Sequence, residues 1–131
     1  VYGNGEQTRD FTYIDDVINS ITTLIKKKEP KGNNKFKNCK PDASSSWAPF
    51  KIFNIGNSSP TNLLEMIKII EENLNKKAIK KMLPMQLGDV EETFADIQSF
   101  NAWTDYKPST SIEIGIKNFI SWYINYYDKS N

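Results

Sequence analysis

The sequence predicts a small α/β fold in which three to four helices accompany few strands. Three stretches repeat apolar residues every three to four positions, as helices that cover a core do. Two short runs rich in β-branched, aromatic or other apolar residues are typical of strands. The chain has 131 residues, a length that suits one domain able to bury a core without disulfides or metals.

The first helix is expected to begin near Tyr13. Residues 1–10 before it indicate a strand end followed by a glycine-rich turn. Asp15 and Asp16 suit the positive N-terminal end of this helix, and the lysines at 26–28 suit its negative C-terminal end. One face of the helix then carries the apolar residues Ile14, Val17, Ile18, Ile21, Leu24 and Ile25.

A long polar loop over 29–49 is expected after this helix. Pro30, Pro41 and Pro49 interrupt the segment, which contains little apolar material. Loops of this length are either functional or tolerated insertions, and we favour an insertion. Cys39 lies here, and as the single cysteine of the sequence it cannot form an intrachain disulfide.

A strand is predicted over 50–55, and a second helix after it. Ser59 is expected as the N-cap of this helix and Pro60 as its first residue, while Asn75 supplies a stop signal. Its buried stripe is expected to consist of Leu63, Leu64, Ile67, Ile70 and Leu74.

The last third of the chain is expected to contain a strand over 78–85, a polar connection over 86–96 and a short helix over 97–103. A capping box of Thr110 and Glu113 predicts the start of the final helix. The inner face of that helix is expected to be Ile112, Ile116, Phe119, Tyr123, Tyr126 and Tyr127. Two or three strands cannot build a large sheet alone, so the sequence predicts part of a larger protein.

The composition excludes several kinds of site. The sequence has no histidine, which rules out a Ser-His-Asp triad, a Cys-His pair and a histidine-ligated metal. A net charge of +1 gives no strong field for nucleic acid or an anionic membrane. The sequence has no run of about 18 apolar residues that would encode a transmembrane helix. It also opens on no secretory signal, so we expect a cytoplasmic protein.

Neither signature of a complete nicotinamide enzyme is present in the sequence. Gly3 and Gly5 lack the third glycine of the dinucleotide fingerprint, because Thr8 stands in its place. No tyrosine is followed four positions later by a lysine, the pair that many such enzymes use for proton transfer.

Arg9 and Asp89 are the candidate ligand-binding residues. Arg9 is the one arginine beside sixteen lysines, and its planar fork grips phosphate or carboxylate in a bidentate manner that lysine cannot match. The alternative is a surface ion pair with Asp10 or Asp16. Asp89 follows Gly88, and glycine permits a ligand to approach the backbone closely.

Three segments in one order, over 9–17, 53–60 and 82–90, resemble the C-terminal half of the NAD-dependent sugar-nucleotide epimerases. These enzymes are extended short-chain dehydrogenase/reductases. The closing segment over 116–123 is similar too, and the resemblance is nearest to the UDP-glucuronate 4-epimerases.

The resemblance implies that residues 1–131 are the substrate-binding domain of a larger enzyme, with the Rossmann domain missing from this chain. That N-terminal domain would bind NAD and carry the catalytic tyrosine and lysine, so the segment alone would be inactive. The full-length protein is implied to be a homodimer. The face of this chain toward the Rossmann domain is expected to be unusually apolar.

The resemblance also implies four substrate-binding residues. The backbone of Tyr2 corresponds to a position that contacts the edge of uracil, and Arg9 to the arginine that holds the diphosphate. Gln86 stands where related UDP-galactose epimerases have an arginine on the diphosphate, and it cannot supply that charge. Asp89 corresponds to a residue at the ribose or the adjoining diphosphate.

The implied reaction is the interconversion of UDP-glucuronate and UDP-galacturonate by transient oxidation at C4, with NAD carrying the hydride. Two alternatives stay open. The protein is another member of the superfamily, a UDP-sugar decarboxylase or dehydratase, or it is a stand-alone, non-catalytic protein that binds nucleotide sugars.

Overall fold

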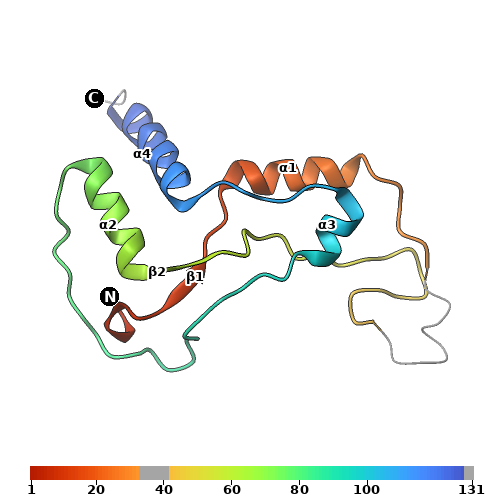
Figure 1. Ribbon diagram of the computed structural model, residues 1–131, viewed down its shortest axis with the longest axis horizontal. Helices are drawn as coiled ribbons and strands as arrows, with labels where there is room; N and C mark the ends of the chain where they lie inside the picture. Colours follow the sequence, from red (N-terminus) through yellow and green to blue (C-terminus); the bar gives the residue numbers. More distant parts are fainter. Residues whose placement is uncertain (33–41, 129–131) are drawn as a thin grey trace.

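The computed structural model describes residues 1–32 and 42–128. Within these ranges it contains four α-helices and one two-stranded sheet, which confirms the small α/β class: α1 (Ile14–Ile25), α2 (Leu63–Leu74), α3 (Gln98–Thr104), α4 (Ile112–Asp128), β1 (Thr8–Asp10) and β2 (Pro60–Asn62). A short 3-10 turn, η1, covers Gly3–Gly5. Figure 1 shows α2 and α4 at one end, α1 and α3 toward the other, and the strands between them.

The central element is β1, which has a neighbour on each side. On one side it pairs antiparallel with β2, so that Arg9 lies opposite Thr61. On the other side the N–H of Thr8 donates to the carbonyl of Glu91 at 2.9 Å, and Thr93 donates back to Thr8 at 3.3 Å. This second contact is a parallel bridge between Thr8 and Glu92. A three-residue strand is thereby fixed by two segments that are distant in sequence.

The order of the first ten residues is the reverse of the expected one, because the glycine-rich turn precedes the strand. Gly5 has a φ of +78°, and a Cβ there would lie 2.5 Å from the side chain of Leu64. Only glycine fits this position, since the start of α2 packs directly onto the turn.

The two predicted strands over 50–55 and 78–85 are wrong. A strand needs a neighbour with which to exchange backbone hydrogen bonds. Lys51 makes only an isolated bridge with Ser45, and in the second segment Leu83 bonds to the carbonyl of Val1 at 2.8 Å without forming a ladder. Both segments are extended, which is what their composition favours, but neither is part of a sheet within the described residues.

The predicted start of the second helix is also wrong. Pro60 begins β2, and α2 begins three residues later at Leu63. Asn62 is the N-cap, because its side chain accepts hydrogen bonds from the N–H groups of Leu64 at 2.8 Å and Glu65 at 3.4 Å. The predicted stop is confirmed, since Asn75 caps the helix in the left-handed region with a φ of 49°.

The final helix is confirmed, but the capping box is not. The hydroxyl of Ser111, rather than Thr110, accepts the N–H of Ile114 at 3.4 Å. Thr110 instead donates its N–H to the carboxylate of Asp16 on α1 at 2.9 Å. A tertiary contact therefore takes the residue that the sequence pattern assigned to the cap. The predicted short helix is confirmed as α3.

Much of each apolar helix face that the sequence predicts to be buried is exposed in the structure. On α1, Asp16 and Ser20 are buried, whereas the exposed fractions of Ile14, Ile18, Ile21 and Ile25 range from 44% to 77%. On α2, Ile69 is buried and Leu64 and Leu74 are exposed; on α4, Ile120 is buried and Phe119, Tyr123, Tyr126 and Tyr127 are exposed.

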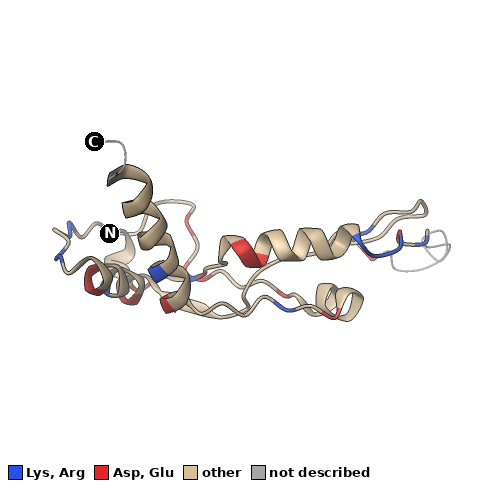
Figure 2. Cartoon of the chain, turned by 90° about the horizontal axis from the view of Figure 1, so that it is seen from above, with Lys and Arg blue, Asp and Glu red and all other residues tan. Residues whose placement is uncertain are grey.

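The cause is that nothing in the described part of the chain covers these faces. Figure 2 shows charge near the two ends of α1 and none along the helix between them. An apolar surface is therefore exposed on α1 and α4, and the expectation that such a face meets the Rossmann domain stays a prediction.

The buried core of the described residues is small. Its centre is Phe100 on α3, which is fully buried and meets Phe53 at a ring distance of 6.1 Å and Tyr106 at 6.4 Å, both edge-on. α2 packs against α4 at the other end of the molecule. Part of the predicted loop over 29–49, including Cys39, lies outside the described residues.

Candidate functional site

Residues 1–10 and 81–93 run side by side in the same direction, and this pairing assembles the candidate site. The contacts progress in step along both segments. Asn4 donates to Leu83 at 3.5 Å, Thr8 bonds to Glu91, and the N–H of Asp10 donates to the hydroxyl of Thr93 at 3.0 Å. Side chains from two regions about 80 positions apart therefore meet on one surface.

Arg9 is held from three directions. Its Nη2 donates to Oδ1 of Asp89 at 2.8 Å, and its Nη1 donates to the carbonyls of Thr8 at 2.9 Å and Glu91 at 3.2 Å. Its side chain is 23% exposed. Of the alternatives left open above, the pair with Asp10 or Asp16 is wrong, since the guanidinium pairs with Asp89. A fork fixed in this way presents its remaining N–H groups in a defined direction.

Asp89 has a partner on each carboxylate oxygen. Oδ1 accepts from Arg9 and from the N–H of Val90 at 2.9 Å, and Oδ2 accepts from Nε2 of Gln7 at 2.8 Å. The hydrogen bond from Gln7 is the main cause that lowers the pKa of Asp89, and the N–H of Val90 and the charge of Arg9 lower it further. The carboxylate is therefore ionised at neutral pH.

Gln7 is the residue of this cluster that the sequence did not single out. It is 5% exposed, and its amide also contacts Sδ of Met85 at 2.9 Å. The available signal was its position two residues before Arg9, because alternate residues of an extended segment point to the same side. The spacing alone does not show which residue the side chain of Gln7 contacts, because that residue lies in the distant segment 81–93.

Gln86 and Asp89 lie at the two ends of a turn. The carbonyl of Gln86 accepts the N–H of Asp89 at 3.1 Å, and Gly88 between them has a φ of +85°. A glycine with positive φ at the third position is typical of a type II turn. Gln86 is exposed.

Tyr2 lies at the beginning of the paired segments. It is 44% exposed, and its carbonyl accepts the N–H of Gly5 at 3.1 Å within η1. The structure thus brings Arg9 and Asp89 into contact, places Gln86 at the other end of the turn from Asp89, and places Tyr2 farther along the same paired segments.

Asp10 fixes the end of β1 beside this cluster. Its Oδ2 accepts the N–H groups of Ser58 and Ala95, each at 3.0 Å, and its Oδ1 accepts that of Ser59 at 3.3 Å. Gly56 is required here, because a Cβ would lie 2.3 Å from the side chain of Ala95 and 3.1 Å from Oδ2 of Asp10. Three chain segments converge on one carboxylate, which restrains the backbone that carries Arg9.

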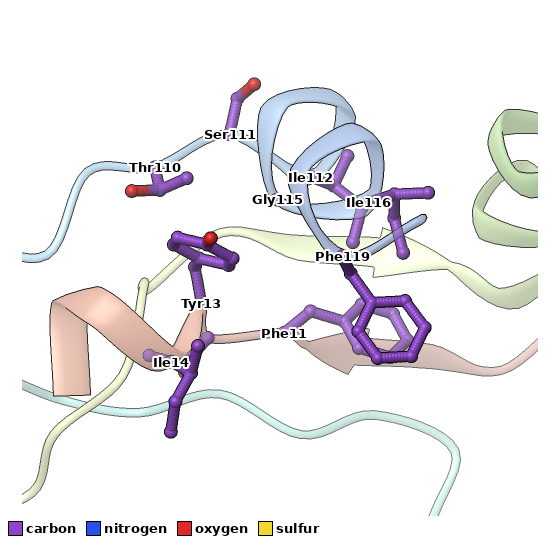
Figure 3. A pocket seen from close by; sticks show the side chains of 10 residues that line it. Phe11, Tyr13, Ile14, Thr110, Ser111, Ile112, Gly115, Ile116 and Phe119 are labelled. Carbon is purple, nitrogen blue, oxygen red and sulfur yellow. The ribbon is translucent and has the colours of Figure 1, made fainter. Parts of the chain in front are cut away.

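A pocket of about 260 Å³ lies next to the site, between the starts of α1 and α4 (Figure 3). Phe11, Tyr13 and Ile14 line one side, and Ile112, Ile116 and Phe119 line the other. The lining is mainly apolar, so the pocket does not offer the chemistry of a phosphate site, and it contains none of the four predicted residues.

No group of His, Cys, Asp and Glu among the residues described could hold a metal ion. None of the helices described has the length and apolar character needed to cross a membrane.

The chain matches a family model described as GDP-mannose 4,6 dehydratase over residues 1–119. It is 43% identical over 129 residues to the protein CapI of Staphylococcus aureus, covering 98% of this chain and 38% of CapI. It is 37% identical over 127 residues to UDP-glucuronate 4-epimerase 5 of Arabidopsis thaliana, covering 96% of this chain and 28% of that protein. The chain therefore spans less than two fifths of the length of these curated relatives.

The chain is also similar in its fold to a solved structure. The UDP-glucuronic acid 4-epimerase of Bacillus cereus, in complex with UDP-glucuronic acid and NAD, superposes with a TM-score of 0.69 and 26% sequence identity. The match covers 94% of this chain and 35% of that one.

Proposed function

This chain belongs to the GDP-mannose 4,6 dehydratase family, within the extended short-chain dehydrogenases/reductases, and from that membership we propose that it is the UDP-sugar-binding part of an NAD-dependent nucleotide-sugar epimerase. The reaction that we propose is the interconversion of UDP-glucuronate and UDP-galacturonate at C4. The Arabidopsis relative and the Bacillus cereus structure, both named for this activity, support the choice. One observation carries the binding role: the single arginine is oriented by Asp89 and two carbonyls at an accessible edge.

Arg9 is proposed to hold the diphosphate. A guanidinium whose Nη atoms are already fixed loses little freedom when it binds, and a charged hydrogen bond to phosphate is about twice as strong as a neutral one. The charges of Arg9 and Asp89 cancel, and Gln86 adds none. A diphosphate must therefore share Arg9 with Asp89, and the positive charge available to it at this site is small.

The neighbouring residues complete the proposed nucleotide site. Asp89 is ionised and accepts three hydrogen bonds, two on Oδ1 and one on Oδ2, which leaves one acceptor site on Oδ2 for a ribose hydroxyl. Gln86 can donate its exposed amide to a phosphate oxygen, and the backbone of Tyr2 is proposed to meet the edge of uracil. Such anchoring positions the reacting sugar from a distance.

The described residues do not fit NAD. The glycine-rich turn η1 leads into a strand, whereas a dinucleotide turn leads from a strand into a helix, and Leu64 fills the space over Gly5 where a pyrophosphate would approach. We assign NAD, which supplies oxidation and reduction at C4, to an N-terminal Rossmann domain outside this chain. The apolar face of α1 and α4 is proposed to pack against that domain, and residues 1–131 alone are proposed to be inactive.

The proposal is tested by incubating the full-length protein with UDP-glucuronate and separating the products by anion-exchange chromatography. An epimerase yields UDP-galacturonate with no release of carbon dioxide. A decarboxylase would yield a UDP-pentose and carbon dioxide, which contradicts the proposed reaction. A 4,6-dehydratase would leave UDP-glucuronate unchanged, because C6 of that sugar is a carboxylate with no hydroxyl to eliminate, and would instead convert UDP-glucose to a 4-keto-6-deoxy sugar. That result contradicts the proposed reaction as well. Binding of UDP without turnover or bound NAD would favour the non-catalytic binding protein.

A further inference from the structure

Gln7 is the buried polar residue of the site, and nothing in the sequence motifs assigns it a role. Its amide lies 2.8 Å from Oδ2 of Asp89, on the oxygen that Arg9 does not bind. A neutral donor and a cation thus hold the same carboxylate from two positions that are two residues apart in the chain. The inference depends on this observation, that Gln7 and Arg9 bind different oxygens of Asp89.

The geometry around Gln7 is rigid. Its side chain is 5% exposed, and its backbone carbonyl accepts the N–H of Leu63, the first residue of α2, at 3.0 Å. A Cβ on Gly3 would lie 3.4 Å from Cγ of Gln7, so the side chain is confined by the turn as well. A donor restrained in this way holds its acceptor in one orientation at little cost in conformational entropy.

The two donors differ in how they respond to an anion. A phosphate competes with Asp89 for the guanidinium of Arg9, because both are anions and the fork has a limited set of N–H groups. The amide of Gln7 has no net charge and is buried behind Asp89, so an arriving phosphate does not draw it away.

We propose that Gln7 is a positioning residue that keeps Asp89 in place for the ribose of a UDP-sugar while Arg9 is shared between Asp89 and the diphosphate. This inference rests on the proposed function, because it needs a nucleotide at the Arg9–Asp89 edge. It assigns Gln7 a role through Asp89 and no direct contact with the substrate.

The first variant is Gln7→Met in the full-length protein. Methionine keeps the length and approximate volume of glutamine and removes the amide donor. The dissociation constant for UDP, measured by calorimetry, is expected to rise about three- to tenfold, the change that the loss of one typical hydrogen bond produces. The KM for UDP-glucuronate is expected to rise by a similar factor, while kcat changes by less than about twofold.

A comparison of Asp89→Asn with the double variant Gln7→Met, Asp89→Asn tests whether Gln7 acts through Asp89. In an Asp89→Asn background, Gln7→Met is expected to change the affinity for UDP by less than about twofold, because the acceptor that it orients has already been altered. Gln98→Met, at the exposed start of α3, is the matched control and is expected to leave all of these values unchanged.

The outcomes distinguish failure of the proposed function from failure of the positioning role of Gln7. A wild-type protein that does not bind UDP overturns the proposed function, and this inference with it. A wild-type protein that binds UDP as tightly as Gln7→Met does overturns the inference alone, as do additive effects of Gln7→Met and Asp89→Asn. A parallel fall in kcat and NAD content would assign Gln7 a general structural role and overturn it as well.

Discussion

Arg9 and Asp89 form an ion pair of 2.8 Å although eighty positions separate them in the chain. The pair forms because residues 1–10 and 81–93 lie parallel, with the backbone bonds at Thr8 fixing their alignment. Solvent screens both partners, whose side chains are 23% and 35% exposed, so the pair adds little to folding. Its consequence is orientation, since it aims the one arginine of the sequence at the proposed nucleotide.

Replacing Arg9 is expected to weaken substrate binding without disturbing the cofactor. In the full-length protein, Arg9→Ala should lower kcat/KM for UDP-glucuronate about 10- to 100-fold, because charged hydrogen bonds to the diphosphate are lost. Arg9→Lys should lower it less, since the charge remains and the bidentate fork does not. Steady-state kinetics and the NAD content of the same preparations measure the two effects.

Lys68→Ala is the control for that experiment, because Lys68 is 70% exposed and makes a surface pair within α2. Unaltered kinetics in Arg9→Ala would remove Arg9 from the binding site.

Introducing a cation at residue 86 is expected to tighten nucleotide binding. Gln86 is exposed and lies at the other end of the turn that carries Asp89, and the site as it stands has almost no net charge. Gln86→Arg should therefore lower the dissociation constant for UDP about three- to thirtyfold at low salt, and less at high salt, where screening is stronger. Calorimetry at two ionic strengths measures both the gain in affinity and its dependence on salt.

Gln98→Arg makes the same charge change on α3 and should have little effect on UDP binding. Equal gains in the two variants would mean that overall charge, rather than a local contact, is responsible.

Asp16 is expected to be a major source of stability at the start of α1. Its carboxylate accepts the hydroxyl of Tyr106 at 3.0 Å and the N–H groups of Ser109 at 3.2 Å and Thr110 at 2.9 Å. Asp16→Ala should lower the free energy of unfolding by about 2–3 kcal/mol, since three partly buried hydrogen bonds to a charged acceptor are lost. Asp15→Ala, at the exposed neighbouring position, should change it by less than about 0.5 kcal/mol.

The contribution of Asp16 should also depend on pH. Burial raises the pKa of its carboxyl, but the hydrogen bonds from Thr110, Tyr106 and Ser109 outweigh burial and leave the pKa below its usual value of 3.8. A lowered folded-state pKa gives stability that is present above the unfolded value and is lost as the pH falls through the folded one. The difference between wild type and Asp16→Ala should therefore shrink below about pH 4. A difference that grows in acid would contradict the assignment.

The exposed face of α1 is expected to make the isolated chain self-associate. Ile14, Ile18, Ile21 and Ile25 are spaced by four, three and four positions, so their exposed side chains form one stripe along the helix. Sedimentation velocity should show species larger than one chain, and a double variant of Ile18→Lys and Ile21→Lys should sediment as a monomer. Asn19→Lys, at an exposed position on another face of the same helix, should still associate. An isolated chain that stays monomeric as its concentration is raised would contradict this expectation.

The helices were predictable because their signals are local. Apolar spacing located α1, α2 and α4, and Asn75 ended α2 as expected because a left-handed C-cap depends on the residue itself. The N-terminal caps failed for a different reason. Thr110 and Ser59 are competent caps by residue type, but hydrogen bonds from their backbone N–H groups to Asp16 and Asp10 hold both residues outside the helices. Ser111 and Asn62 accept the first helical N–H groups instead. Local capping preferences are worth about 1 kcal/mol, which tertiary hydrogen bonds can exceed.

The expected strands failed because a strand is defined by its partner. Residues 50–55 and 78–85 have the composition of strands, yet β1 instead pairs with Pro60–Asn62, a segment with little strand character. The buried stripes of α1 and α4 failed similarly, since periodicity shows which face is apolar and not what covers it.

The sequence by itself determined the helices, the apolar character of their faces, the absence of histidine chemistry and the family motifs that contain Arg9, Gln86 and Asp89. Each of these follows from residue type and short-range spacing. Only the tertiary structure decided that Asp89, rather than Asp10 or Asp16, holds Arg9, and that the buried amide of Gln7 holds the other oxygen of Asp89. Those contacts depend on the alignment of two segments about eighty residues apart, which backbone hydrogen bonds fix and no local pattern encodes.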